Sequence, residues 1–510
     1  MNINEAKEQI KMAVSIYLQK DEHGKYRIPQ ERQRPVFMIG APGIGKTAVV
    51  EQIAQEMDIA IVSYSMTHHT RQSALGLPII KHRKYGEKEY DVSEYTMSEI
   101  IASIYETMER TKKTEGILFL DEINCVSETL APSMLLFLQY KMFGRHRVPD
   151  GWVVVTAGNP PQFNRSVREF DIVTLDRMKV IEVDADYDAW RTYAVNVGIH
   201  TSIITYLDIK TNDFYLIEST IDGKSYVTAR GWENLSEAIY LHEEMNFPVD
   251  ESLIGQYIRN KKIAREFASY YELYIKYRQD YHIEQILSGN TDRSVKERVR
   301  KAGFDERVSL MGLLLSAIQS DIRRVVTLED ELKILYPRLK KIKELFSGRI
   351  SREQCFDALE YEAEMAEKTL ESGRIAGSVS EAEEGVMLSV IKVIREYKDM
   401  LNLNSVAESD EAFALIKEDF DSRVSLMRAE NDKVRSRLDN LFDFVERELS
   451  DDNEMLILIT DLTINSSSAH FISTNGCDKY FKYNSKYQLH ERGKLLLKKA
   501  DQLEVGGNAL

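Results

Sequence analysis

The stretch of this chain that most constrains its fold is a glycine-rich turn of eight residues. It reads Gly40-Ala41-Pro42-Gly43-Ile44-Gly45-Lys46-Thr47, which matches the pattern G-x-x-x-x-G-K-[ST] in full. The apolar run 35–39 before it predicts a buried strand, and the apolar spacing over 47–56 after it predicts a helix. Such a turn directs backbone N–H groups and the positive end of the helix at a polyphosphate. We therefore expect it to bind a nucleoside triphosphate, with Lys46 at the β- and γ-phosphates and the Thr47 hydroxyl on Mg²⁺.

Two adjacent carboxylates stand at the end of a second apolar run. Residues 116–120 predict a buried strand, and Asp121 and Glu122 follow it directly. Downstream of a phosphate-binding turn, Asp121 would hold Mg²⁺ through water, and Glu122 would orient and polarise the water that attacks the γ-phosphate. The alternative is a solvated strand terminus, because apolar strands often end in acidic residues. The pairing with the turn favours the catalytic interpretation.

A third apolar run, 152–157, predicts another strand, and Asn159 lies at its tip. In a parallel sheet this tip lies at the same edge as the two carboxylates. Asn159 is therefore a candidate for positioning the attacking water. The alternative is an ordinary turn residue before Pro160, because Asn-Pro pairs are common in turns.

Two arginines follow these strands. Arg177 precedes a predicted strand at 179–183, and Arg230 opens a predicted amphipathic helix. Their order after two catalytic strands suggests that they stabilise charge during phosphoryl transfer, one from a neighbouring subunit and one from a lid. Either arginine taken alone reads as a surface residue.

In this order the motifs resemble the AAA+ ATPases, and more narrowly their MoxR-like, dynein-related branch. The resemblance covers roughly residues 30–245, and its further supporting segments are 120–124, 143–152, 157–160, 175–177 and 188–190. The segment 76–78 is similar to an insert that this branch carries between its second and third strands. One position departs from the pattern, because many relatives have arginine where this chain has Cys125. The resemblance therefore assigns no inter-subunit charge to that position.

The resemblance implies roles for named residues. Asn159 would be sensor 1, Arg177 the arginine finger acting on the adjacent subunit of a homo-hexameric ring, and Arg230 sensor 2 on a helical lid. Arg165 and Arg168 lie in the same connecting segment as Arg177 and are alternatives for the finger. The expected cofactors are ATP and Mg²⁺, and ATP is preferred over GTP on the resemblance alone.

The predicted fold is an α/β P-loop NTPase core of the AAA+ type with a parallel sheet in the order 5-1-4-3-2. A small helical lid and a mostly α-helical C-terminal extension follow it. We place the core at 1–185, the lid at 186–250 and the extension at 251–510. The extension is predicted helical because eight of the ten prolines precede residue 162 and only one follows Pro248.

Apolar residues recur at helical spacing within 387–401, 413–427 and 434–449. Such stripes favour a packed core over a docking face, and an antiparallel helical hairpin between about 381 and 449 is the simplest arrangement. In the tail, residues 479–487 interleave lysines with aromatic residues. We prefer a solvated amphipathic edge there to a surface that stacks bases. The histidines at 68, 69 and 82 show no ligand spacing, so a zinc site is not expected.

The composition is that of an ordinary soluble protein, with 43% apolar and 29% charged residues in 510, which allows two to four domains. No apolar run reaches the length of a membrane helix, and the N-terminus lacks the features of an export signal. The three cysteines show no metal-like spacing and suit a reducing compartment, so we expect a cytoplasmic protein. The net charge of −15 opposes a general nucleic-acid surface.

The first functional hypothesis is a Mg²⁺-dependent ATPase that remodels, assembles or activates a partner protein in the manner of a chaperone. The resemblance implies a partner with a von Willebrand factor A domain. The alternative is a nucleic-acid-associated motor of a restriction or defence system, similar to McrB-type subunits. A nucleotide-gated scaffold that hardly turns over is less suited to Glu122, and a small-molecule kinase would leave Asn159, Arg177 and Arg230 without a role.

Overall fold

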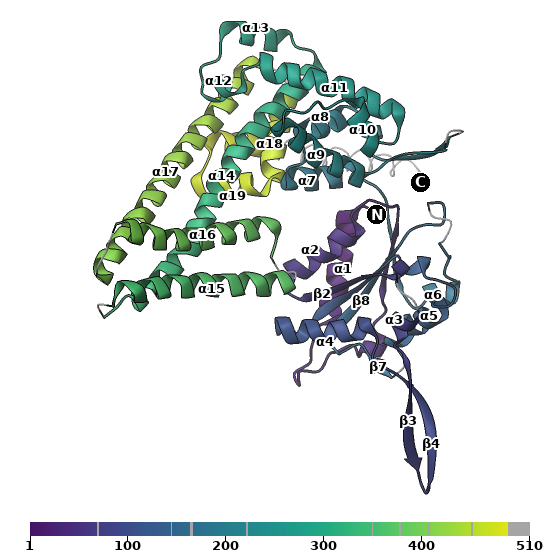
Figure 1. The fold of residues 1–510 in the computed structure, drawn as a ribbon. Helices are drawn as coiled ribbons and strands as arrows, with labels where there is room; N and C mark the ends of the chain where they lie inside the picture. Colours follow the sequence, from purple (N-terminus) through teal and green to yellow (C-terminus); the bar gives the residue numbers. More distant parts are fainter. Residues whose placement is uncertain are drawn as a thin grey trace, which may run out of the picture. The chain divides into compact units, whose positions relative to one another are not determined.

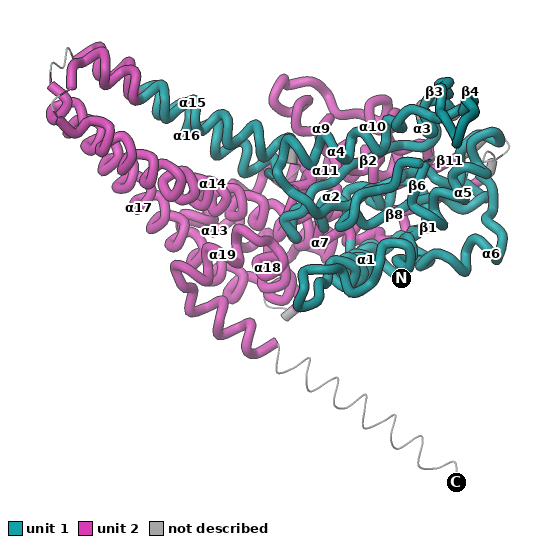
Figure 2. Tube along the Cα trace, turned by 90° about the horizontal axis from the view of Figure 1, so that it is seen from below, with its two compact units in different colours: residues 1–189, 359–396 teal, residues 190–358, 397–510 magenta. Residues whose placement is uncertain are grey.

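In a computed structural model of the chain (Figure 1), the described residues are 1–68, 71–143, 145–163, 167–220, 223–348, 350–376, 379–404, 408–449 and 452–487. They form two compact units (Figure 2). The first comprises 1–189 and 359–396, and the second comprises 190–358 and 397–510.

The first unit is built around a five-stranded parallel sheet (Figure 1). Its strands are β1 (Val36–Gly40), β2 (Ala60–Ser65), β5 (Gly116–Asp121), β8 (Trp152–Gly158) and β9 (Lys179–Val183). Their order across the sheet is β2-β5-β8-β1-β9. Counted along the chain as first to fifth, this is 5-1-4-3-2, so the predicted sheet order is confirmed. The carboxyl ends of all five strands consequently lie at one edge.

The central strands are apolar because they are covered on both faces. Every residue of β8 is buried, and in β5 only Asp121 at the carboxyl end is partly exposed. Strands buried on both faces read as continuous hydrophobic runs rather than as alternating patterns. This explains why 116–120 and 152–157 stand out in the sequence as unbroken apolar stretches.

Helices cover both sides of the sheet (Figure 1). They are α1 (Ile3–Tyr17), α2 (Lys46–Glu56), α3 (Arg71–Leu75), α4 (Glu99–Thr111), α5 (Ala131–Tyr140) and α6 (Ile172–Leu175). The longer ones begin at polar caps: Asn2 and Glu5 form a capping box at α1, and the Ser98 hydroxyl accepts the Ile101 N–H at α4. The unit also includes much of α15 (Arg352–Ala376) and α16 (Glu381–Leu403). An ion pair joins these two helices, with Arg395 Nη1 of α16 lying 2.8 Å from Glu367 Oε1 of α15.

A β-hairpin projects from this unit between β2 and β5 (Figure 1). Strands β3 (Pro78–Tyr85) and β4 (Lys88–Tyr95) pair antiparallel through a two-residue turn at Gly86, whose φ of 65° favours glycine. The sequence indicated an insert at 76–78 but not its form. Both strands are largely exposed, so they lack the buried face that produces an alternating hydrophobic pattern. A second, very short hairpin consists of β6 (Met142–Phe143) and β7 (His146–Arg147).

The second unit is mainly helical. Its helices include α7 (Tyr187–Val197, beginning at the boundary between units), α8 (Thr201–Ile209), α9 (Ala229–Glu244), α10 (Glu251–Tyr257), α11 (Lys261–Asp280), α12 (Ile283–Leu287), α13 (Arg293–Lys301), α14 (Phe304–Leu345), α17 (Ser409–Glu448), α18 (Asp452–Ile464) and α19 (Ser466–Asn475). Helices α7, α8 and α9 lie within 186–250, the range where a small helical lid is predicted. Between the last two lies a hairpin that the sequence did not reveal, made of β10 (Leu216–Thr220) and β11 (Gly223–Val227).

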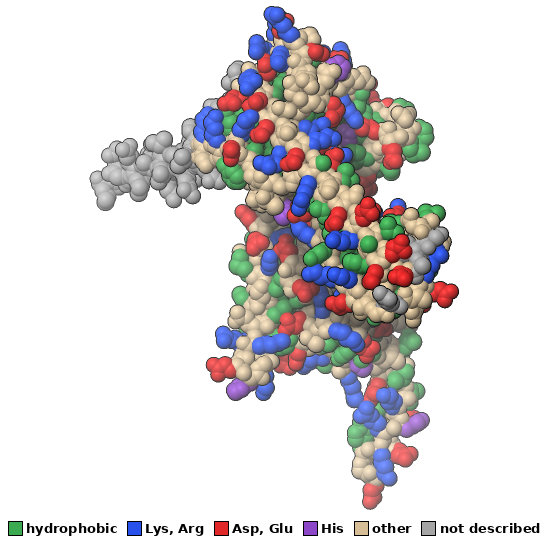
Figure 3. All heavy atoms as spheres, turned by 90° about the vertical axis from the view of Figure 1, so that its left-hand side faces the viewer, with side chains coloured by type: hydrophobic (Ala, Val, Ile, Leu, Met, Phe, Trp, Pro, Cys, Tyr) green, Lys and Arg blue, Asp and Glu red, His purple; other side chains and the backbone are tan. Residues whose placement is uncertain are grey.

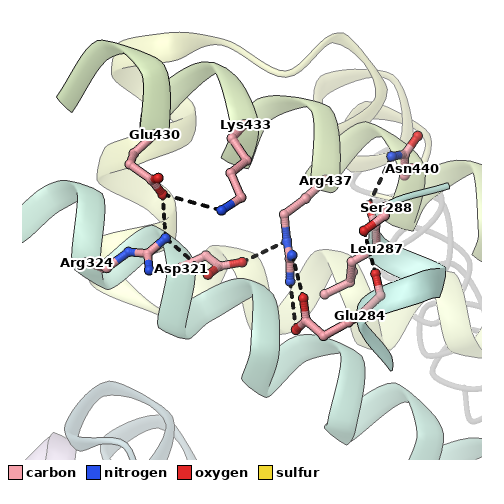
Figure 4. Close-up of polar contacts among 9 residues, drawn as sticks. All are labelled: Glu284, Leu287, Ser288, Asp321, Arg324, Glu430, Lys433, Arg437 and Asn440. Carbon is pink, nitrogen blue, oxygen red and sulfur yellow. Dashed lines mark hydrogen bonds and ion pairs between the residues drawn. The ribbon is translucent and has the colours of Figure 1, made fainter. Parts of the chain in front are cut away.

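The longest helices, α14 and α17, pack against each other (Figure 1). Arg437 of α17 forms ion pairs with Asp321 of α14 at 2.8 Å and with Glu284 of α12 at 2.7 Å (Figure 4). The Tyr336 and Phe420 rings of the same two helices stack at 6.0 Å. The hairpin prediction for 381–449 was therefore wrong for α17, which pairs with a helix a hundred residues upstream. The core assignment of the 434–449 stripe is confirmed, because its apolar residues are buried.

One face of the interleaved tail segment belongs to this core, while residues 481, 482, 485 and 486 are exposed on the other. Residues 478–487 are helical, and Tyr480 and Tyr483 are buried. Tyr483 stacks on Phe442 of α17 with ring centroids 6.3 Å apart, and Lys479 pairs with Asp443. Aromatic rings packed in this way are not available for stacking on bases, which removes the base-stacking alternative for these two tyrosines. The segment is amphipathic as expected, but its aromatic face is packed rather than solvated.

Among the described residues, no single helix is long and apolar enough to cross a membrane, and only α18 and α19 taken together across a 91° bend meet that test of length and composition.

Candidate nucleotide site

The glycine-rich turn joins β1 to α2 at the carboxyl edge of the sheet. Gly45 caps α2 with a φ of 90°, a left-handed conformation that favours glycine. Gly40 lies against β9, where a Cβ would stand 2.5 Å from the Val183 carbonyl oxygen. The strand, turn and helix predicted for a phosphate-binding loop are therefore all present, and the turn can bring its backbone close to a ligand.

The Lys46 side chain is held inside this turn. It is buried, and its Nζ donates to the carbonyl oxygens of Gly40 and Ala41, both at 2.8 Å, and to Asn159 Oδ1 at 2.9 Å. The third bond links the loop lysine to the tip of β8. Two residues that the sequence placed in separate motifs, 113 positions apart, thus lie in direct contact.

We expect Lys46→Ala to weaken ATP binding by roughly 10- to 100-fold, because it removes charge-assisted hydrogen bonds to the phosphates. Titration with a fluorescent ATP analogue measures this. The exposed hairpin variant Lys88→Ala is the matched control and should bind as the unsubstituted protein does. Equal affinities for the two variants would show that the turn does not hold the phosphates.

Thr47 and Asp121 form the second pair of the site. The Thr47 hydroxyl donates to Asp121 Oδ2 at 2.9 Å, and the other carboxylate oxygen accepts the Glu122 N–H at 2.8 Å. A hydroxyl beside a carboxylate supplies the hard oxygen ligands that Mg²⁺ prefers. These donors fit the ion that the sequence motifs imply, with Thr47 as a direct ligand and Asp121 acting through water.

Glu122 has a strained backbone and a hydrogen-bonded side chain. Its φ of 54° is left-handed, which is costly for a residue with a Cβ and is found preferentially at functional positions. Its Oε2 accepts hydrogen bonds from the Ser65 hydroxyl at 3.3 Å and the Thr67 hydroxyl at 3.1 Å. The candidate water-activating carboxylate is thus held by the end of β2.

Three of the residues that organise this site were not identified from the sequence. Ser65 and Thr67 hold Glu122, and Asn124 is almost fully buried and donates from Nδ2 to the Asn159 carbonyl oxygen at 2.8 Å. A signal was present for the first two. In the predicted order the second strand neighbours the third, so polar residues at its carboxyl end had to lie beside Asp121 and Glu122, and the register pairs Ser65 with Asp121.

Arg177 lies on the surface of the first unit, just after α6. It is exposed, and its Nη1 donates to Gln139 Oε1 on α5 at 2.8 Å. Both elements that meet here carry exposed apolar side chains: Leu136, Tyr140, Ile172 and Val173. A concentration of exposed apolar residues around a charge is typical of an interaction surface.

The two alternative finger residues are placed differently. Arg168 forms an ion pair with Glu128, and its N–H donates to the Asn124 carbonyl oxygen at 2.9 Å. Arg165 lies outside the described residues. Arg230 belongs to the second unit, where it is exposed in the first turn of α9, after the Thr228 cap. Its role as sensor 2 stays a prediction.

The site therefore combines a glycine-rich loop, a hydroxyl–carboxylate pair that fits Mg²⁺, a positioned carboxylate and a polar strand tip at one edge of a 5-1-4-3-2 sheet. This arrangement defines a P-loop nucleotide-hydrolysing domain. Residues 36–173 match the family model described as ATPase family associated with various cellular activities (AAA). The chain accordingly contains an AAA ATPase domain within its first unit.

Comparisons with solved structures and with curated proteins add little to this assignment. The structure of C. elegans PCH-2 is similar at 15% sequence identity with a TM-score of 0.24, over 42% of this chain and 52% of that chain. The chain thus spans about half the length of that protein. A comparison with curated proteins finds no match.

Proposed function

We propose that this chain is a Mg²⁺-dependent, MoxR-like ATPase that hydrolyses ATP between the subunits of a ring and uses the cycle to remodel or activate a partner protein. The observation that carries the proposal is the meeting of Lys46, Thr47, Asp121, Glu122 and Asn159 at the carboxyl edge of the sheet. A phosphate-binding loop alone serves many functions. A strained carboxylate beside it, with a polar strand tip opposite, supports hydrolysis in particular.

The residues divide the work of hydrolysis. The turn from Gly40 to Gly45 and the Lys46 ammonium bind and orient the phosphates. Thr47 and Asp121 would hold Mg²⁺, which would neutralise charge on the phosphate oxygens. Glu122 accepts a proton from the attacking water and orients it, and Asn159 fixes the position of that water at the γ-phosphate.

The ring is proposed from the surface around Arg177. A finger that serves the neighbouring subunit has to lie away from its own nucleotide loop on a surface suited to a partner, and Arg177 is exposed beside the apolar side chains of α5 and α6. Its hydrogen bond to Gln139 fixes the guanidinium at that surface. These features support a homo-oligomer in which each subunit completes the site of the next.

The remodelling part of the proposal rests on the size of the helical region beyond the nucleotide core and on the resemblance to the MoxR-like branch. The expected partner carries a von Willebrand factor A domain. The test is a pull-down with the Glu122→Gln protein in Mg-ATP, followed by mass spectrometry, with Lys46→Ala as the matched bait that does not hold nucleotide. A partner with such a domain that is recovered only by Glu122→Gln supports the proposal, and equal recovery by both baits contradicts nucleotide-dependent remodelling.

One observation favours the second candidate, a nucleic-acid-associated motor. Along the β3–β4 hairpin, Lys81, Arg83, Tyr85, Lys88 and Tyr90 share one face, because they occupy alternate positions in the paired register. Figure 3 shows basic side chains, interspersed with acidic ones, along this hairpin. Tyr85 and Tyr90 contact each other at 6.0 Å between ring centroids. Basic and exposed aromatic side chains on one surface are what a single strand of nucleic acid binds.

Salt dependence separates the two candidates. The affinity for a labelled single-stranded oligonucleotide is measured at several salt concentrations for the unsubstituted protein and for a Lys81→Gln, Arg83→Gln, Lys88→Gln triple variant. A motor of this kind predicts a steep fall of affinity with salt and a slope that is shallower in the variant. If the oligonucleotide does not bind, or if affinity falls with salt equally steeply in both proteins, the motor is excluded and the remodelling ATPase is the remaining candidate.

A further inference from the structure

The second unit contains a cavity that takes no part in the nucleotide site. It has a volume of about 570 Å³ and is lined by α8, α9, α11, α12 and α14. A second hollow of about 320 Å³ adjoins it and shares four lining residues with it, Thr201, Tyr240, Ser316 and Ser320. Together they fall within the range of small-molecule sites in proteins.

A buried tyrosine opens into this cavity without a hydrogen-bond partner. Tyr274 is only 3% exposed and lines the larger chamber, and within the described ranges its hydroxyl makes no hydrogen bond. Its neighbours on α11 are satisfied: Tyr271 donates to Glu243 at 2.9 Å, and Tyr270 donates to Thr205 at 2.6 Å. The Tyr274 hydroxyl is therefore open to the cavity and can bond a group that enters it.

The carboxylates of the cavity are already occupied. Glu243 accepts from Tyr271 at 2.9 Å and Arg278 at 3.0 Å, and it pairs with His200 at 3.4 Å. Burial opposes its ionisation, but hydrogen bonding and charge from these groups, chiefly His200, lower the pKa of Glu243 to about 2. Glu284 is held by Arg437 (Figure 4). The polar groups left open to a ligand therefore include hydroxyls, which can donate to an anion, rather than free carboxylates.

An arginine side chain lies at the smaller of the two hollows. Arg323 lines the smaller hollow, and no carboxylate in the described part of the chain pairs with it. It lies over Gly198, where a Cβ would stand 2.8 Å from Arg323 Nη1, so the guanidinium packs closely against this glycine. The next residue, Arg324, pairs with Glu430 (Figure 4) and is not among the residues that line either hollow.

Between the two ends stand aromatic rings. His200 and Tyr240 meet edge to face with ring centroids 4.8 Å apart, and both line the larger chamber. Such rings provide a surface for a planar group. The hydroxyls of Thr201 and Ser316 lie along the same wall.

We propose that this cavity binds an aromatic organic anion, with its phosphate or carboxylate at Arg323, its ring against Tyr240 and His200, and an acceptor atom at the Tyr274 hydroxyl. Phosphate and carboxylate both offer the acceptor oxygens that a guanidinium binds in a bidentate manner. The site is separate from the phosphate-binding turn and does not depend on ATP hydrolysis.

The test uses two probes, AMP for the phosphate form and indole-3-acetate for the carboxylate form. Isothermal titration calorimetry is done on the full chain carrying Lys46→Ala, because this substitution removes the lysine that is expected to bind the phosphates at the nucleotide site. We expect one or both probes to bind. Binding of AMP alone assigns a phosphate ligand, and binding of indole-3-acetate alone assigns a carboxylate.

Two variants locate the binding. In the same background, Tyr274→Phe should weaken it by roughly 3- to 10-fold and Arg323→Gln by about tenfold or more. The matched controls are Tyr277→Phe, on the same helix, and Arg324→Gln, the next residue of α14, and both should leave the affinity unchanged. The proposal is overturned if neither probe binds at millimolar concentration, or if binding is equal in all four variants.

Discussion

Glu122→Gln should reduce ATP turnover by about 10²- to 10⁴-fold while ATP still binds, because the amide keeps the size of the side chain but cannot accept a proton from water. The neighbouring groups make this a clean comparison. Ser65 and Thr67 donate to Oε2, and an amide oxygen can accept the same bonds. Phosphate release measures turnover, and titration with a fluorescent ATP analogue measures binding.

Glu87→Gln, in the exposed turn of the β3–β4 hairpin, removes the same charge far along the projecting hairpin and serves as the control. It should hydrolyse ATP at the rate of the unsubstituted protein. If Glu122→Gln kept more than a tenth of that rate, another group would have to activate the water. A loss of binding together with turnover would instead mean that Glu122 supports the fold of the site.

Arg177→Ala should lower turnover by about 10³-fold or more with little change in ATP affinity, because an arginine finger acts on charge that develops during transfer. The decisive measurement mixes subunits. In rings made from Arg177→Ala and Lys46→Ala proteins, an intact finger can stand beside an intact loop, and part of the activity should return.

Arg168→Ala provides the comparison from the same connecting segment. It loses an ion pair with Glu128 but should keep most of the activity. Normal hydrolysis by Arg177→Ala would show that the finger is elsewhere, with Arg168 or Arg165 next to be tested. Full loss without any recovery in mixed rings would place the role of Arg177 within its own subunit.

The nucleotide core was predictable because its determinants are local. The turn at 40–47 specifies its own conformation through glycine, and buried parallel strands are recognisable in the sequence as continuous apolar runs. Once these were placed in order, the resemblance supplied the sheet order that the structure confirms. Sequence alone also named Lys46, Thr47, Asp121 and Asn159, which the structure brings into contact.

The features that sequence analysis missed depend on pairings between distant or exposed segments. The β3–β4 hairpin has no buried face to impose a period, and α17 was assigned to the wrong partner because its apolar stripe fits any helix of similar length. The true partners of α17 are identified by specific ion pairs, because Arg437 of α17 pairs with Asp321 of α14 and Glu284 of α12. Likewise, the tail tyrosines could be assigned to the core only once Phe442 was placed beside them.

The bonds of Lys46 have a consequence for the energetics of ligand capture. Its ammonium already has three oxygen partners, so arrival of a phosphate is an exchange of acceptors rather than a simple gain. The affinity then measures the difference between two sets of hydrogen bonds. Because Asn159 is one of these partners, such an exchange would free the side chain that is proposed to position the attacking water. Occupancy of the loop and release of Asn159 would then be coupled in one equilibrium.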